Sequence, residues 1–88
     1  MISAAEREIW SIAELPDAYQ AEYLLLRGKV AMQKEQYENA RLYLRQAEQI
    51  KGLPKLLQRE LYHCMELCGK ELEDYPSAYE YAAKQLNL

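Results

Sequence analysis

Apolar residues recur every three or four positions along most of this chain, which is the spacing of amphipathic helices. Five helical segments and no strand follow from the pattern. The predicted helices span about 4–14, 16–34, 37–50 and 54–73, and a short fifth helix begins at Tyr75. Because the connections are mostly two to four residues long, successive helices are expected to pack antiparallel. The pattern therefore predicts an all-α fold made of antiparallel helical hairpins.

Residues at the ends of these segments support the predicted bounds. Ser3 and Glu6 have the spacing of a capping box, in which two side chains satisfy free backbone N–H groups at a helix start. Pro16 disfavours a helical conformation at the residue before it, and it can open the next helix because the first turn needs no N–H there. Gly52 followed by Pro54 is typical of one helix ending and another beginning.

Each predicted helix carries apolar stripes that we expect to face the core. In chain order these stripes are Ile2, Ala5, Ile9, Ile12 and Ala13; Tyr19, Tyr23, Leu26 and Val30; Leu24, Gly28 and Ala31; Tyr37, Ala40, Leu44, Ala47 and Ile50; Leu57, Leu61, Cys64, Cys68 and Leu72; Tyr62, Met65 and Gly69; and Ala78, Tyr79, Ala82 and Leu86. The helix at 16–34 has two stripes, so we expect it to lie between two neighbouring helices.

Composition and charge narrow the class of protein. The chain has 88 residues and a mass of 10.3 kDa, which indicates one domain and leaves no room for a large two-domain enzyme. A net charge of -3 argues against nucleic acid as a partner. Residues 27–59 nevertheless hold eight bases against three glutamates. We interpret this stretch as a solvated helix face, with a patch for an acidic protein partner as the alternative and RNA as a more remote one.

Membrane and secreted proteins fit the sequence poorly. No apolar run reaches the roughly 18–20 residues that a membrane-spanning helix needs, and no secretory signal opens the chain. Cys64 and Cys68 are the only cysteines, too few for a disulfide framework. We therefore expect a cytoplasmic protein with reduced thiols.

The same two cysteines are the first candidates for chemistry. Together with His63 they offer ligands of the kind that zinc binds. On a helix, however, His63 points about 100° away from Cys64, and no further ligand completes a site. Because both cysteines lie on an apolar stripe, we expect them to be buried core thiols. No glycine-rich phosphate loop or paired nucleophile and base is evident, so we expect no enzyme, no metal and no cofactor.

The tyrosines are numerous, with eight of them and no phenylalanine. Most are expected to pack with their hydroxyl groups near the surface. Tyr43 and Tyr81 lie beside the predicted stripes, and we expect these two to be exposed contact residues.

A repeat organises the chain. The EQYENA run that contains Tyr37 and Ala40 returns as the EDYPSA run that contains Tyr75 and Ala78. We expect each tyrosine to wedge the corner between two antiparallel helices, and each alanine to let them approach closely. At these residues the chain resembles the tetratricopeptide repeat family, whose helix-turn-helix units of about 34 residues stack side by side. The further matching positions are Leu24, Gly28, Leu44 and Ala47 in the first copy and Tyr62, Met65, Gly69 and Ala82 in the second.

The resemblance implies a short TPR-like alpha-solenoid of about five helices in one domain, 1–88. Its parts would be an extra helix at 1–15, a first repeat at 16–53 and a second repeat at 54–88. Stacking of at least three repeats is usual for this architecture. The shorter array implies completion by a partner protein or by a second copy through an uncapped end.

The resemblance also implies a function, which is the binding of a peptide or amphipathic helix of a partner protein in a concave groove. Carried over position by position, the groove residues would be Glu22, Leu25, Lys29, Met32, Gln33, Glu60, His63, Leu67, Lys70 and Glu71. The leucines and the methionine would accept apolar side chains, while Lys29 and Lys70 would pair with acids of the partner. The Lys, Asn and Arg set with which some members grip a C-terminal carboxylate is not matched.

Three alternatives remain open on the sequence. In the first, the groove positions are ordinary surface residues of a solenoid fragment. In the second, the chain is a regulatory or dimerisation fragment of a larger, bacterial signalling protein. In the third, Cys64 and Cys68 form a thiol-based metal or redox sensor.

Overall fold

The computed structural model describes residues 16–88, and these residues form helices and no strand. Within that range the order is α2 (Asp17–Gln33), α3 (Tyr37–Glu48), α4 (Lys55–Glu71) and α5 (Tyr75–Leu86). The all-α prediction is confirmed for this part of the chain, and the predicted bounds differ from the observed ones by at most two residues. The helix predicted for 4–14 lies outside the described residues.

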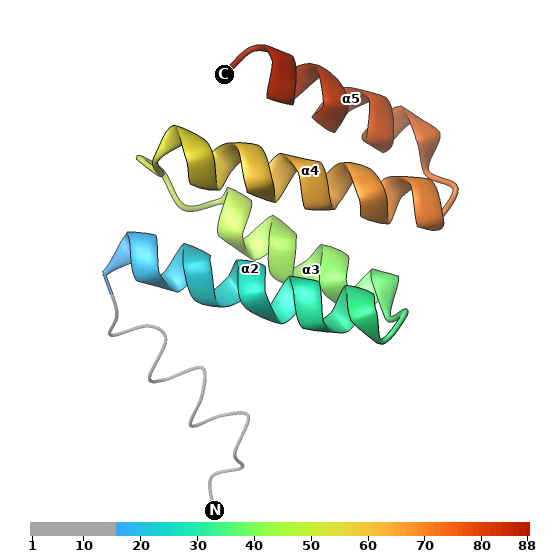
Figure 1. The fold of residues 1–88 in the computed structure, drawn as a ribbon, viewed down its shortest axis with the longest axis horizontal. Coiled ribbons are helices and arrows are strands. Elements are labelled where there is room, and N and C mark those ends of the chain that lie inside the picture. Colours follow the sequence, from blue (N-terminus) through green and yellow to red (C-terminus); the bar gives the residue numbers. More distant parts are fainter. Residues whose placement is uncertain (1–15) are drawn as a thin grey trace, which may run out of the picture.

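Consecutive helices form two antiparallel hairpins, α2–α3 and α4–α5 (Figure 1). The helices α2 and α4 run in the same direction, and α5 lies on the side of α4 that faces away from the first hairpin (Figure 1). Of the described helices, α4 is the one that contacts each of the other three. The second hairpin is therefore attached to the first chiefly through α4.

Two helices end in the same way, although neither end carries a glycine. Glu35 follows α2 with a φ of 60°, and Glu73 follows α4 with a φ of 58°. After α2, the Glu35 N–H donates to the Met32 carbonyl and the Gln36 N–H donates to the Ala31 carbonyl, each at 2.9 Å. The same two bonds recur at the equivalent positions after α4, with lengths of 3.1 and 2.7 Å. This is the Schellman cap, which satisfies free carbonyl groups by turning one residue into the left-handed conformation.

Two prolines and one glycine lie at helix boundaries, as predicted. Pro16 directly precedes α2 and Pro54 directly precedes α4. Gly52 has a φ of 75° in the connection between α3 and α4, a conformation that glycine adopts without steric penalty. Asp74 caps α5 by accepting a hydrogen bond from the Ser77 N–H at 3.5 Å.

The core lies between α2, α3 and α4. Its largest fully buried side chains are Leu44, Leu61, Met65 and Cys68. A β-carbon placed on Gly28 would lie 2.8 Å from Leu44 Cδ2, so the glycine is what allows α2 to approach α3 at this point. These residues belong to predicted stripes, and every stripe residue of α3 and α4 is buried or half-buried, as predicted.

Two predicted stripes are only partly buried. In α2, Tyr19 and Leu26 are exposed, because α3 and α4 pack against the other side of this helix. In α5, Tyr79 and Leu86 were predicted to face inward. This prediction is wrong, because the two residues are 77% and 87% exposed. The reason is that α5 packs on α4 with Ala78 as its buried residue, and no described helix covers its opposite side.

The prediction of exposed tyrosines is also wrong. Tyr43 and Tyr81 are half-buried and pack against the core cluster. The exposed tyrosines of the described region are Tyr19, Tyr75 and Tyr79. A position beside a stripe is still within reach of the core because a tyrosine ring is long enough to turn towards it.

Candidate partner-binding surface

A hollow of about 300 Å³ opens between α2 and α4, the two helices to which the groove residues were assigned. We call it the α2–α4 hollow, and its lining residues are Glu22, Leu25, Leu26, Lys29, Leu57 and Glu60. Four of the ten candidate groove residues are brought together here, namely Glu22, Leu25, Lys29 and Glu60. Because the connection within each hairpin is short, α2 and α4, the first helices of the two hairpins, lie side by side. Residues that are far apart in the sequence therefore meet at this hollow.

An ion pair between Lys29 and Glu60 spans the hollow from one hairpin to the other. Both side chains are close to half exposed, at 42% and 47%, so water screens the pair and its contribution to stability is at most about 1 kcal/mol. Lys70 is similarly occupied, because its Nζ lies 3.0 Å from Glu66 Oε2. Both lysines expected to meet acids of a partner therefore already have partners within the chain.

The remaining candidate residues do not line this hollow. Met32 is half-buried and packs against the core, and Leu67 is also half-buried. Gln33, His63 and Glu71 are exposed on the same two helices. His63 Nδ1 lies 4.0 Å from Glu66 Oε1 of the same helix.

Two leucines of the hollow were not among the candidates. Leu26 and Leu57 were assigned to core stripes because of their spacing, but Leu26 is exposed and Leu57 is half-buried. They supply apolar surface between the charged residues Glu22, Lys29 and Glu60. Helical spacing identifies the apolar side of a helix, but it carries no signal for how far a neighbouring helix covers that side.

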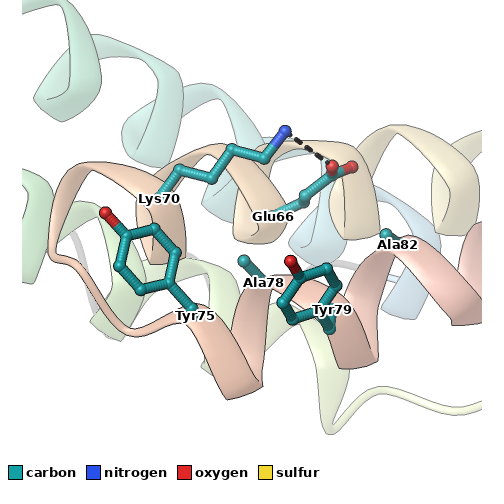
Figure 2. Close-up of a pocket in the computed structure, with 6 residues that line it drawn as sticks. All are labelled: Glu66, Lys70, Tyr75, Ala78, Tyr79 and Ala82. Atoms are coloured by element: carbon teal, nitrogen blue, oxygen red, sulfur yellow. Dashed lines mark ion pairs between the residues drawn. The ribbon is translucent and has the colours of Figure 1, made fainter.

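A second hollow, of about 480 Å³, lies between α4 and α5. We call it the α4–α5 hollow, and its lining residues are Glu66, Lys70, Tyr75, Ala78, Tyr79 and Ala82 (Figure 2). Glu66 accepts a hydrogen bond from Gln85 Nε2 at 2.7 Å as well as pairing with Lys70. The hydrogen bond from Gln85, followed in size of effect by that from Lys70, holds the pKa of the Glu66 carboxyl below its usual value. This carboxylate is therefore kept charged by groups of its own chain.

Polar side chains tie the two hairpins together on the α3 side. Arg41 Nη1 lies 2.7 Å from Asp74 Oδ2, and the Tyr81 hydroxyl donates to Glu48 Oε1 at 3.1 Å. Lys84 Nζ lies 3.6 Å from Glu48 Oε2. Burial raises the pKa of Tyr81, and the adjacent Glu48 carboxylate raises it further. These contacts occupy Arg41, one of the bases in the basic stretch, in an internal ion pair.

The cysteines lie in the core, as predicted. Cys68 is fully buried and Cys64 nearly so, and both are free thiols. Burial raises the pKa of both thiols, and that of Cys68 reaches about 11. Because the thiolate is the reactive form, burial and a raised pKa together make a thiol unreactive. Within residues 16–88, no group of three or more His, Cys, Asp or Glu residues is placed to hold a metal ion.

Comparison with known proteins identifies no relative. No family model, curated protein or solved structure matches the chain. Among the helices of the described region, none has the length and apolar character needed to cross a membrane.

Proposed function

We propose that this chain is a non-enzymatic protein-interaction module, in which two tetratricopeptide-like hairpins present the α2–α4 hollow to an amphipathic peptide or helix of a partner protein. The observation that carries the proposal is the hollow itself, with apolar Leu26 and Leu57 between charged side chains. Such a surface suits a ligand with one apolar face and polar flanks.

The likeness of the two hairpins supports the repeat part of the proposal. Glu35 and Glu73 occupy equivalent positions of the two repeats, adopt the same left-handed conformation and take part in the same pair of backbone hydrogen bonds. The first helices of both hairpins run parallel (Figure 1). Parallel first helices are what a tandem repeat requires if they are to form one continuous binding surface.

The internal ion pairs refine the kind of partner. Lys29 is neutralised by Glu60 and Lys70 by Glu66, so an acidic partner would first have to displace these glutamates. We therefore propose that apolar contacts supply most of the affinity and that the Lys29–Glu60 pair sets the orientation of the ligand. Exposed charge pairs at a rim contribute more to specificity than to affinity.

Selection of peptides on the full chain tests this proposal. Peptides enriched from a random display library are titrated against the wild type, Leu26→Glu and Leu42→Glu. Leu26 and Leu42 are each 58% exposed, but Leu42 lies on α3 and outside the α2–α4 hollow. We expect Leu26→Glu to weaken binding by about tenfold or more, which corresponds to about 1.4 kcal/mol, and Leu42→Glu to leave it unchanged.

Two outcomes would count against the hollow as the binding site. Peptides that bind Leu26→Glu as tightly as the wild type would place binding elsewhere. Failure to enrich any peptide over the urea-unfolded chain would argue against a peptide-binding module. Far-ultraviolet circular dichroism of both variants serves as the control for folding.

A further inference from the structure

The outer side of α5 carries a row of exposed apolar side chains. Tyr75, Tyr79, Ala82 and Leu86 are spaced so that they share one face of the helix. Tyr75, Tyr79 and Leu86 are 53%, 77% and 87% exposed. With Glu66 and Lys70 of α4 they form what we call the α5 end face, which includes the α4–α5 hollow. Figure 2 shows the two tyrosine rings beside Ala78, with the Lys70–Glu66 ion pair along the α4 side.

The repeat itself indicates what kind of structure fits this face. The alignment that places Tyr75 on Tyr37 also places Tyr79, Ala82 and Leu86 on Arg41, Leu44 and Glu48 of α3. In the first hairpin two of these α3 positions meet the second hairpin. Arg41 pairs with Asp74, and Glu48 contacts Tyr81 and Lys84, while Leu44 is fully buried in the core. The α5 end face is thus the equivalent of a face that, in the first hairpin, is covered by another hairpin of this chain.

The side chains at the equivalent positions differ in polarity. In the first hairpin the contacts of Arg41 and Glu48 are ionic and hydrogen-bonded. In the second, Tyr79 replaces the arginine and Leu86 replaces the glutamate, so the same positions offer apolar surface instead. Large exposed apolar groups that gather on one face are characteristic of an interaction surface.

The charges on the α5 end face allow it to meet a copy of itself. The α4–α5 hollow contains one acid and one base, Glu66 and Lys70, and these are already paired within the chain. The residues that line two such hollows therefore carry no net charge to repel one another, although the whole chain has a net charge of -3. A two-fold contact places the same residues on both sides of an interface, and a face with one charge of each sign is self-complementary in that arrangement.

We propose that the α5 end face pairs with the same face of a second copy of this chain, giving a two-fold dimer centred on Tyr79 and Leu86. The contact is of modest size. A tyrosine buries roughly 150–250 Å² when fully covered, so the exposed parts of Tyr75, Tyr79 and Leu86 supply a few hundred Å² per copy. A standard stable interface takes about 800 Å² per partner, and we therefore expect a dissociation constant in the micromolar range.

This pairing leaves the α2–α4 hollow accessible. In Figure 1 α5 lies at the opposite side of the molecule from α2. A dimer would present two hollows at once, which raises the apparent affinity for a partner with two binding segments. The dimer does not depend on the peptide-binding proposal, because the two use different faces.

The experiment is sedimentation velocity on the full chain at concentrations from about 5 to 500 μM, a range that brackets micromolar dissociation constants. We expect the wild type to shift with concentration from the monomer mass of 10.3 kDa towards twice that mass. Tyr79→Glu and Leu86→Glu should each weaken dimerisation at least about tenfold, because a charge on each copy would meet its equivalent at the two-fold axis.

The matched control is Leu42→Glu. Leu42 is 58% exposed, close to the 53% of Tyr75, but it lies on α3 and outside the α5 end face. This variant should dimerise like the wild type, and circular dichroism should show that all variants remain helical. A wild type that stays monomeric across the whole range would overturn the proposal. A dimer that tolerates both Tyr79→Glu and Leu86→Glu would also overturn it, since another face would then form the contact.

Discussion

At the scale of single residues, Asp74 combines two structural roles. Its carboxylate caps α5 through the Ser77 N–H, and it pairs with Arg41 of the first hairpin. The hydrogen bonds from Ser77 and then from Arg41 hold the pKa of Asp74 below its ordinary value. A carboxyl whose pKa is lower in the folded chain stabilises the fold at pH values above its unfolded pKa. That stabilisation disappears as the pH falls through the folded pKa.

Asp74→Asn tests this role. Asparagine is a good helix cap but carries no charge, so the variant loses the pairing with Arg41 and keeps a capping side chain. We expect a lower melting temperature than the wild type at neutral pH, and a difference that narrows as the pH approaches about 3. Thermal melts followed by circular dichroism across this range measure it.

Asp17→Asn is the control for the Asp74 experiment. Asp17 is exposed in the first turn of α2, so Asp17→Asn, like Asp74→Asn, removes a carboxylate from the start of a helix. We expect a smaller effect at neutral pH than for Asp74→Asn, because the interaction lost there is mainly that with the helix dipole. Equal effects of the two changes would mean that the Arg41–Asp74 pair does not stabilise the fold.

The cysteines and tyrosines show how far reasoning from single residues reaches. Burial of Cys64 and Cys68 followed correctly from their place on an apolar stripe. The expected exposure of Tyr43 and Tyr81 was wrong, because a long side chain beside a stripe can turn towards the core. Tyr81 moreover finds its hydrogen-bond partner, Glu48, in the other hairpin, and no local pattern predicts such a contact.

At the scale of elements, the two Schellman caps use glutamate where glycine is the usual residue. A side chain with a β-carbon is strained in the left-handed conformation that Glu35 and Glu73 adopt. The helix bounds were still predictable, since the apolar stripes stop at these points and Tyr37 and Tyr75 begin the next helices. The type of cap was not, because its usual glycine signal is absent.

Replacement of either cap residue by glycine tests the strain. We expect Glu35→Gly and Glu73→Gly each to raise the free energy of unfolding by about 0.5–1 kcal/mol, because relief of the strain exceeds the added entropy of the unfolded chain. Urea denaturation measures the change. The control is Glu22→Gly, which makes the same chemical change inside α2 and should lower the free energy of unfolding by about 1 kcal/mol. Destabilisation by either cap variant would contradict the assignment of strain.

The faces of the helices were harder to predict than their bounds. In α3 and α4 the predicted stripes are buried or half-buried, because these helices have neighbours on the side that the stripes face. In α5 the periodicity is equally clear, but only Ala78 of the stripe is buried, and Tyr79 and Leu86 are exposed. Periodicity identifies an apolar face, whereas its burial depends on which other helix reaches it.

At the scale of the whole molecule, one core joins the two hairpins. Cys64 and Cys68 of α4 belong to the same buried cluster as Leu24 of α2 and Leu44 of α3. Reagents can reach these thiols only when the hairpins separate or the helices unfold. The cysteines are therefore natural reporters of global opening.

Thiol labelling tests this expectation and addresses the sensor alternative. With an aromatic disulfide reagent at neutral pH, both thiols should react at least about 100-fold more slowly in the folded chain than in urea. Their reactivity should rise together across the unfolding transition. A variant with Cys64→Ala follows Cys68 alone, and one with Cys68→Ala follows Cys64. Fast reaction of either thiol in the folded protein would favour a redox function over a structural one.

The candidate binding surface was partly predictable at this scale. The resemblance to tandem hairpins assigned Glu22, Leu25, Lys29 and Glu60 to one groove, and they do line one hollow. It did not identify Leu26 as an exposed residue of that hollow, and it left Lys29 and Lys70 free for a partner. The Lys29–Glu60 pair depends on how closely α2 and α4 approach, which is a property of the packed structure. Lys70 and Glu66 are instead four residues apart on one helix, so their pairing is local.

By itself, the sequence determined the internal repeat, the burial of the two thiols and, for residues 16–88, the helical class and the helix bounds. These follow from local interactions, since helix spacing and turn residues act over a few positions. Only the tertiary structure decided which apolar faces are covered, that Lys29 pairs with Glu60 of the other hairpin, and that α5 presents Tyr79 and Leu86 to the outside. The physical reason is that burial and cross-hairpin ion pairing arise between residues far apart in the chain, where the packing of one hairpin on the next sets the distance.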